Sequence, residues 1–178
     1  MKSNSPRTTS SAGAFTLIEV TLALGVATFC LVTISALLPI GLTSNQASLE
    51  QTMAANISSA IVADLRSAQP MSTGTSPRFG FSIPAAGATT TIPIAPQTIY
   101  LAANGTVTSV DSAPATSGSA VSRYRATLGF APPPTGGQRT ATTVRVLITW
   151  PALADTSPSQ WPTNYTGSYE AATTLDRN

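Results

Sequence analysis

The hydrophobic and polar positions of this 178-residue chain change pattern twice along its length. The first pattern is a nearly uniform apolar run from Ala14 to Leu42, with no charged residue from Val20 onward. At about 1.5 Å per residue, a helix of this length crosses a hydrocarbon core about 30 Å thick. The run therefore predicts a membrane-spanning helix over residues 15–42.

The second pattern, over residues 43–69, is typical of an amphipathic helix. Polar residues occupy most of the helix surface, whereas apolar residues recur every four positions at Leu49, Met53, Ile57, Ile61 and Leu65. This apolar face needs a partner, and Gln69-Pro70 is expected to end the helix. We expect one continuous helix from Phe15 to about Ala68.

Pro39 and Gly41 interrupt the apolar run near its end. A proline removes one backbone hydrogen bond and crowds the carbonyl four residues earlier, so a kink or a locally melted turn is expected. Two interpretations stay open: a device that lets the helix flex, and the ordinary tolerance of membrane helices for proline.

The third pattern, over residues 70–178, consists of short alternating runs separated by Gly, Pro, Ser and Thr. Asn104-Gly105 signals a tight hairpin, and the Pro132–Gly137 loop joins the two best strands, which we expect to pair antiparallel. The tail is either disordered or forms one short strand. The predicted strands are Arg78–Ile83, Gln97–Leu101, Thr106–Val110, Tyr124–Phe130, Val144–Trp150 and, in the tail, Tyr165–Ala171.

These patterns together predict an α+β fold, with a long N-terminal helix packed on a small antiparallel sheet. Charged residues make up 9% of the chain, against about a quarter in a typical soluble protein, and the net charge is +2. Such a weak positive charge does not indicate a nucleic-acid partner, which needs a clustered basic face.

The composition also excludes several kinds of catalytic and metal site. The chain has no histidine and one cysteine, Cys30, so Ser-His-Asp and Cys-His catalysis and His-containing zinc sites are absent. The few carboxylates are scattered, without the spacing of a calcium loop or a catalytic pair. We expect neither an enzyme nor a metal or other cofactor.

Three arginines and two tryptophans of the third region are further candidates. Arg123, Arg125 and Arg145 fall on the polar face of the two best strands, as a basic patch or, more simply, a solvated sheet face. Trp150 and Trp161 are interpreted as core residues rather than as a platform for a ligand.

Glu19 is the conspicuous residue of the first region, because a carboxylate at membrane depth is costly and is a functional candidate by default. The preceding residues 1–14 carry Lys2 and Arg7 and no acidic residue, which indicates a basic leader peptide. Positive charge before the span predicts a cytoplasmic N-terminus and an exported C-terminal part over residues 70–178.

The run of residues 13–20, GAFTLIEV, resembles the N-terminal signal of type IV pilins, minor pilins and the pseudopilins of type II secretion. The resemblance covers the leader and about the first fifty residues. It implies a pilin-like fold and cleavage between Ala14 and Phe15 by a prepilin peptidase, which also N-methylates Phe15. It further implies assembly into a filament through Thr16, Leu17, Ile18 and Glu19.

The partners that this resemblance implies are the prepilin peptidase, other pilin or pseudopilin subunits, an inner-membrane assembly platform and membrane lipid. It places the chain in the inner membrane, with its C-terminal domain in the periplasm, and then in the filament. Residue 14 departs from the family pattern, which strongly prefers glycine there. A cut after Gly13 restores glycine but moves Glu19 to the sixth mature position, so cleavage after Ala14 is preferred.

The longer pattern, which continues through LLPIGL at residues 37–42 and IVADLR at residues 61–66, is similar to the cassette protein B family of Verrucomicrobia. This similarity implies a minor rather than a major filament subunit. Two alternatives from other classes stay open. One is a single-pass anchored binding domain that does not polymerise, and the other is a secreted protein released by a signal peptidase near Ser35–Ala36.

Overall fold

The structure, a computed structural model, describes residues 15–68, 74–84, 95–118, 120–131 and 141–176. The chain forms two compact units, Met1–Gln46 and Ala47–Asn178. One helix, α1 (Leu17–Ser67), contributes to both units. The other elements belong to the second unit: β1 (Gly74–Thr75), β2 (Ser82–Ile83), β3 (Gln97–Leu101), β4 (Val107–Val110), β5 (Tyr124–Phe130), β6 (Thr142–Trp150), η1 (Ala152–Ala154) and β7 (Gly167–Leu175).

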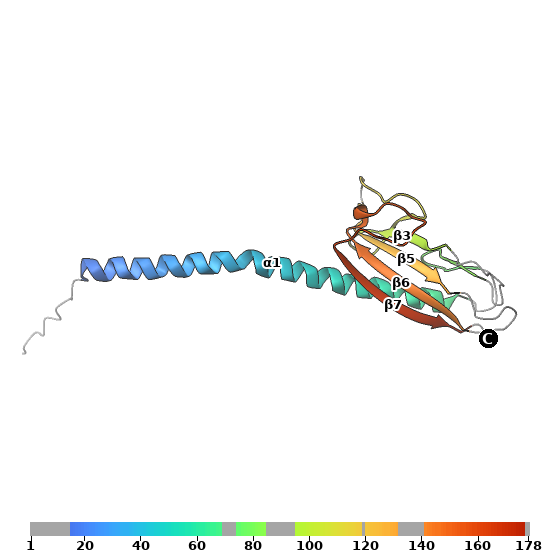
Figure 1. Cartoon of the computed structure of the whole chain (residues 1–178), viewed down its shortest axis with the longest axis horizontal. Helices are drawn as coiled ribbons and strands as arrows, with labels where there is room; N and C mark the ends of the chain where they lie inside the picture. Colours follow the sequence, from blue (N-terminus) through green and yellow to red (C-terminus); the bar gives the residue numbers. More distant parts are fainter. Residues whose placement is uncertain (1–14, 69–73, 85–94, 119, 132–140, 177–178) are drawn as a thin grey trace, which may run out of the picture. The chain divides into compact units, whose positions relative to one another are not determined.

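Five of the strands form one antiparallel sheet in the order β4-β3-β5-β6-β7 (Figure 1). The predicted hairpin is confirmed, because β3 and β4 pair around Asn104 and Gly105, where Gly105 has a φ of 79°. The Asn104 side chain accepts hydrogen bonds from the backbone N–H and the hydroxyl of Thr106. The predicted antiparallel pairing of the two best strands, β5 and β6, is confirmed as well. The loop predicted at Pro132–Gly137 lies outside the described residues.

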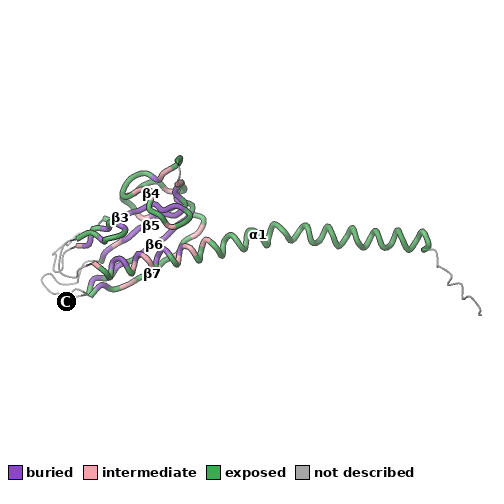
Figure 2. Tube along the Cα trace, turned by 180° about the vertical axis from the view of Figure 1, so that it is seen from behind, coloured by how far each residue is buried: buried purple, intermediate pink, exposed green. Residues whose placement is uncertain are grey.

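The core of the second unit lies between one face of this sheet and the end of α1. Alternate residues of β5 and β6 enter it, from Tyr124 to Phe130 and from Val144 to Trp150. They meet the helix residues Ala54, Ile57, Ile61 and Leu65. Figure 2 shows that α1 changes from exposed to partly buried along its length, and its buried positions all lie in the part beside the sheet. The predicted α+β arrangement is therefore confirmed.

The predicted apolar face of the amphipathic half is only partly correct. Ile57, Ile61 and Leu65 are buried, but Leu49 is 59% exposed. A spacing of four residues advances by about 400°, so a strict four-residue repeat drifts about 40° around the helix at each step. The face that packs on the sheet instead follows Ala54, Ile57, Ile61 and Leu65, with spacings of three and four.

Pro39 and Gly41 do not end the helix. α1 is assigned as helix throughout Leu17–Ser67, with Pro39 inside it, so the expected melted turn is not present. A change of helix direction at Pro39 stays a prediction. The predicted stop at Gln69-Pro70 lies outside the described residues, and α1 ends at Ser67.

The strand predicted over Arg78–Ile83 is wrong for most of its length. Only Ser82–Ile83 forms strand β2, although Phe79, Phe81 and Ile83 are buried in the core as their alternation indicated. The reason is local hydrogen bonding from two side chains. Asp64 of α1 accepts the N–H groups of Arg78 and Phe79 at 2.9 and 3.0 Å, and Ser76 Oγ accepts that of Phe81 at 3.1 Å. These bonds hold the segment as a turn rather than a ladder.

The strand alternative for the tail is the one that the structure shows. β7 extends over nine residues, further than the short strand predicted at Tyr165–Ala171, and pairs with β6 without a register shift. Its apolar signal is weak because Ser, Thr and Ala fill most of it. Only Leu175 is buried, while Tyr169 packs partly against the core.

Replacing the buried Asp64 carboxylate tests whether it holds the residue 74–84 segment against α1. Asp64→Ala leaves the N–H groups of Arg78 and Phe79 without their acceptor, so we expect a loss of about 1–3 kcal/mol in the free energy of unfolding. Asp64→Asn keeps one oxygen acceptor and should lose less. Denaturant unfolding followed by tryptophan fluorescence measures both, and equal stability of Asp64→Ala and the unchanged chain would contradict the assignment.

Candidate functional site

The candidate assembly site is built at the first turn of α1. Phe15 and Thr16 precede the helix, which begins at Leu17. The Thr16 carbonyl accepts hydrogen bonds from the N–H groups of Glu19 and Val20 at 3.0 and 3.2 Å. The Thr16 hydroxyl lies 3.4 Å from the same Glu19 nitrogen, so Thr16 is the N-cap of the helix.

This geometry gives the residues TLIE a local role that the resemblance alone does not supply. A threonine followed three positions later by glutamate is the spacing of a capping box, in which both residues satisfy free N–H groups of the first turn. The spacing is visible in the sequence, although the prediction for Glu19 did not depend on it. Only the threonine half of the box is formed here, because Thr16 accepts the N–H of Glu19 whereas the Glu19 carboxylate bonds to no described residue. Thr16 therefore fixes where α1 begins, two residues after the predicted cleavage position.

Most other polar side chains of the apolar run bond to their own helix. The hydroxyls of Thr21, Thr28 and Thr33 each donate to a carbonyl three or four residues earlier, at 2.7–2.9 Å. Such bonds hide the hydroxyl from an apolar medium. Glu19 differs, since its carboxylate forms no hydrogen bond or ion pair with any residue that the structure describes.

The surface around Glu19 is apolar and uncovered. Every residue of α1 from Leu17 to Leu49 is exposed, including large apolar side chains such as Ile18, Leu24 and Phe29. This helix is long and apolar enough to cross a membrane, with a mean hydropathy of 2.2 in its most apolar window. An exposed apolar surface of this extent needs lipid or other protein surfaces to cover it.

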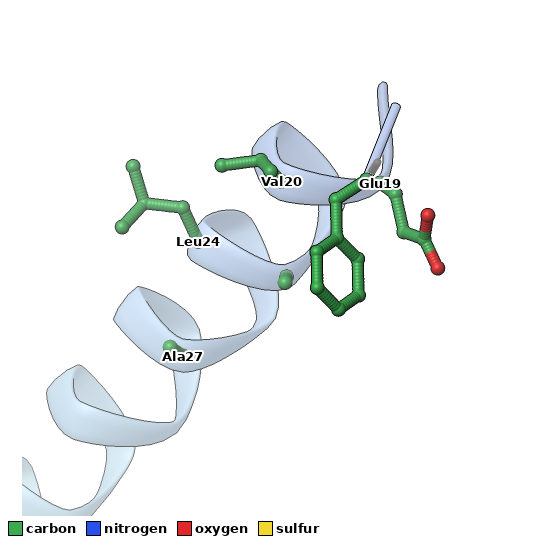
Figure 3. A pocket seen from close by; sticks show the side chains of 6 residues that line it. Glu19, Val20, Leu24 and Ala27 are labelled. Atoms are coloured by element: carbon green, nitrogen blue, oxygen red, sulfur yellow. The ribbon is translucent and has the colours of Figure 1, made fainter. Parts of the chain in front are cut away.

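A hollow of about 620 Å³ lies on the same side of the helix as Glu19. Figure 3 shows the Glu19 carboxylate directed away from the helix, with Val20, Leu24 and Ala27 further along. Ala23 and Ala27 lie one and two turns after Glu19, and the hollow is lined by Phe15, Glu19, Val20, Ala23, Leu24 and Ala27. Small residues let a second helix approach closely. Thr16, Leu17, Ile18 and Glu19 were predicted as assembly residues from the sequence, whereas Ala23 and Ala27 were not.

Only one of the two residues at the predicted cleavage position is described by the structure. Phe15 is described and exposed, whereas Ala14 and the leader lie outside the described residues. The structure therefore brings Phe15 and Glu19 to one hollow, and the cut between Ala14 and Phe15 stays a prediction.

The arginines proposed as a basic patch are each paired with a carboxylate. Arg123 pairs with Glu50 of α1, Arg125 with Asp155 at 3.0 Å, and Arg145 with Glu170 at 2.6 Å. The solvated face expected here is wrong for Arg125, which is 1% exposed. Its guanidinium donates to the carbonyls of three residues in the segment after β6, namely Asp155, Ser157 and Gln160.

That segment also places Trp161 on the same face of the sheet. The Trp161 ring packs so closely on Gly129 that a Cβ there would lie 2.5 Å from it, and Arg145 stacks 4.5 Å from the ring centroid. Trp150 is a core residue as predicted, but Trp161 belongs to this second, polar cluster instead. Arg125 is buried because the segment after β6 covers it. The alternation of apolar and polar residues within β5 does not reveal this contact.

The Asp155 carboxylate contacts several members of this cluster, which comprises Arg125, Arg145, Trp161 and the segment after β6. Burial alone would raise the pKa of the Asp155 carboxyl, but N–H groups of Thr163 and Ser157 and the nearby Arg125 hold its pKa below the usual value. The carboxylate accepts from Ser157 N at 3.1 Å and Thr163 N at 2.9 Å. Arg145 likewise lowers the pKa of Glu170 through a hydrogen bond from Arg145 to Glu170.

Within the part of the chain that the structure describes, no group of three Cys, Asp or Glu side chains is placed to hold a metal ion. No protein-family model matches the chain, and neither a curated protein nor a solved structure matches it.

The Asp155 cluster predicts a dependence of stability on pH. Because the folded pKa is lowered, the stabilisation is present above the unfolded pKa of about 3.9 and is lost as the pH falls through the folded pKa. Asp155→Asn should already lose about 3 kcal/mol at pH 7, because it leaves the buried Arg125 charge uncompensated. It should also show a weaker further loss in acid.

Unfolding free energies at pH 7 and pH 3, from denaturant titrations of the full chain in detergent, measure both effects. Glu170→Gln is the matched control, since its ion pair with Arg145 is half exposed and should contribute less than about 1 kcal/mol. An Asp155→Asn chain with unchanged stability at pH 7 would show that the cluster does not hold the segment.

Proposed function

We propose that this chain is a structural subunit, of the minor type, of a type IV pilus-like filament or a type II secretion pseudopilus. It is inserted in the inner membrane with its N-terminus in the cytoplasm and its second unit in the periplasm. A prepilin peptidase cuts between Ala14 and Phe15 and N-methylates Phe15. The subunit then enters the filament through α1.

The observation that carries this proposal is the position of the Glu19 carboxylate and its lack of a partner among the described residues. It lies in the first turn of a helix whose apolar surface is uncovered, and no described residue pairs with it. A carboxylate in lipid is costly, so it is retained where a partner arrives. Cleavage before Phe15 creates a new positive amino group beside the same hollow.

Pairing between copies explains how one charge can set the register of the filament. At a separation of about 4 Å and an effective dielectric of 20, opposite unit charges attract by about 4 kcal/mol. The amino terminus of one subunit can meet Glu19 of its neighbour only when two helices are correctly aligned. A misaligned pair leaves a charge unpaired in an apolar medium, which costs more than the pair contributes.

The hollow beside Glu19 also provides a surface on which the α1 helix of a neighbouring subunit can pack closely. Ala23 and Ala27 follow Glu19 along one side and leave room for a neighbouring α1. Lipid tails are as apolar as the side chains of the helix, so there is no hydrophobic driving force for helices to associate within a membrane. Close packing of small residues is therefore a main source of helix association there. The same α1 surface is thus covered first by lipid and then by sister helices.

Substitution of Glu19 tests this role. Glu19→Ala should insert in the membrane and fold like the unchanged chain but be lost from filaments. The reason is that it lacks the carboxylate that pairs with the amino terminus of the neighbouring subunit. Incorporation is measured in sheared filament fractions from the native host, and folding by protease resistance of the second unit. Glu50→Ala is the matched control, since Glu50 lies on the same helix but pairs with Arg123 in the second unit.

The opposite result is equally definite. Normal incorporation of Glu19→Ala would contradict the proposal. If the chain is instead an anchored binding domain, exchanging residues 15–42 for an unrelated span of equal length should preserve its activity, whereas the filament proposal requires that exchange to abolish it.

A further inference from the structure

One edge of the five-stranded sheet is open. β7 is the last strand in the order β4-β3-β5-β6-β7, and no described strand pairs with its outer side (Figure 1). Its register with β6 is regular over nine pairs, from Thr142 with Leu175 to Trp150 with Gly167. A regular edge of this length presents a row of free backbone donors and acceptors.

The ladder shows which residues present them. Ala131 donates its N–H to the carbonyl of Thr143, so odd-numbered residues of β6 bond to β5. Hydrogen-bonded and non-hydrogen-bonded pairs alternate in an antiparallel ladder, and even-numbered residues of β6 therefore bond to β7. Following the register across, the backbone groups directed at the open edge are those of Ser168, Glu170, Ala172 and Thr174, which are all exposed.

The two edges of the sheet differ in how well they resist further pairing. β4 has four residues, its pairing shifts register between Tyr100 and Leu101, and it is followed by Asp111, whose φ is 44°. Short length and irregularity are the usual protection of an edge. β7 has no proline, lysine or register shift, and its one charge, Glu170, is held by Arg145 at 2.6 and 3.0 Å.

An arginine that forms no ion pair among the described residues lies beside this open edge. Arg66, in the last turn of α1, is exposed and donates to the Thr173 hydroxyl at 2.9 Å. Arg123, Arg125 and Arg145 have carboxylate partners, but Arg66 forms no ion pair with any residue that the structure describes. A hollow of about 300 Å³ lies beside it, lined by Arg66, Thr143, Ala172, Thr173 and Thr174.

From this geometry we infer that β7 is a docking site for an extended segment of a partner protein, which adds as a sixth strand and carries a carboxylate opposite Thr173. Residues opposite Ala172 and Thr174 would form the hydrogen-bonded pairs. The residue between them would project on the same face as Thr173, where Arg66 lies. Backbone bonds then provide affinity and the acid at one position provides selectivity.

A second copy of this chain fits the edge less well. Two β7 strands in full antiparallel overlap would place Tyr169 of one copy opposite Thr173 of the other, which gives Arg66 no carboxylate. β4 of a second copy is too short and too irregular to cover nine residues. Charge complementarity at Arg66 therefore favours a partner segment with an acidic residue.

A peptide titration of the full chain in detergent tests this inference without any filament. The probe is fluorescein-labelled Thr-Glu-Thr-Val-Thr-Val-Thr, which places its glutamate opposite Thr173 in antiparallel pairing, and the second probe has lysine in place of the glutamate. Fluorescence anisotropy should show the glutamate peptide binding about fivefold or more tightly than the lysine peptide. Slower amide hydrogen exchange at residues 168, 170, 172 and 174 should accompany binding.

Two variants make the result specific to this edge. Arg66→Glu should reverse the preference between the peptides, whereas Arg78→Glu, the same charge change at an arginine outside the hollow, should leave it unchanged. Ala172→Pro removes an outward N–H and should abolish binding of both. No binding at about 1 mM peptide, or a preference that Arg66→Glu does not alter, would overturn the inference. Neither result bears on Glu19, so the proposed filament function is tested independently.

Discussion

Hydrophobic burial along α1 is the constraint on which the structure depends. One continuous helix has two apolar surfaces, and the residues that the structure describes bury only the second of them. Near its end, Ile57, Ile61 and Leu65 are buried by the sheet of the second unit. Over its first part every described side chain is exposed, and an apolar surface of this extent needs lipid or other protein surfaces to cover it.

Charged residues are few, and three of the arginines in the described part of the chain pair with carboxylates. On the far face of the sheet, Arg125 and Asp155 fix a long connection against the strands, while Arg145 and Glu170 tie two strands together. Among the described charged groups that form no ion pair, Glu19 on α1 and Arg66 beside β7 each line a hollow on the surface. Our two proposals assign each of them a partner outside the chain.

The sequence was sufficient for features that repeat locally and insufficient for features that depend on distant residues. The alternation in β5 and β6 and the Asn104-Gly105 turn follow from neighbouring residues, so they were predictable. The turn at Arg78 depends on Asp64, and the burial of Arg125 depends on carbonyls some thirty residues later. The strand β7 was uncertain because its Ser, Thr and Ala residues carry little hydrophobic signal.

The site was predictable in part for the same reason. Glu19 stands out because it is the one charge in an apolar run, whereas the contribution of Ala23 and Ala27 emerges only from their place beside it on the helix. The most direct test of the account is the N-terminal mass spectrum of the protein extracted from its native membrane. We predict a chain that begins with N-methylated Phe15, and a chain that retains its leader from Met1, or one that begins near Ala36, would contradict it.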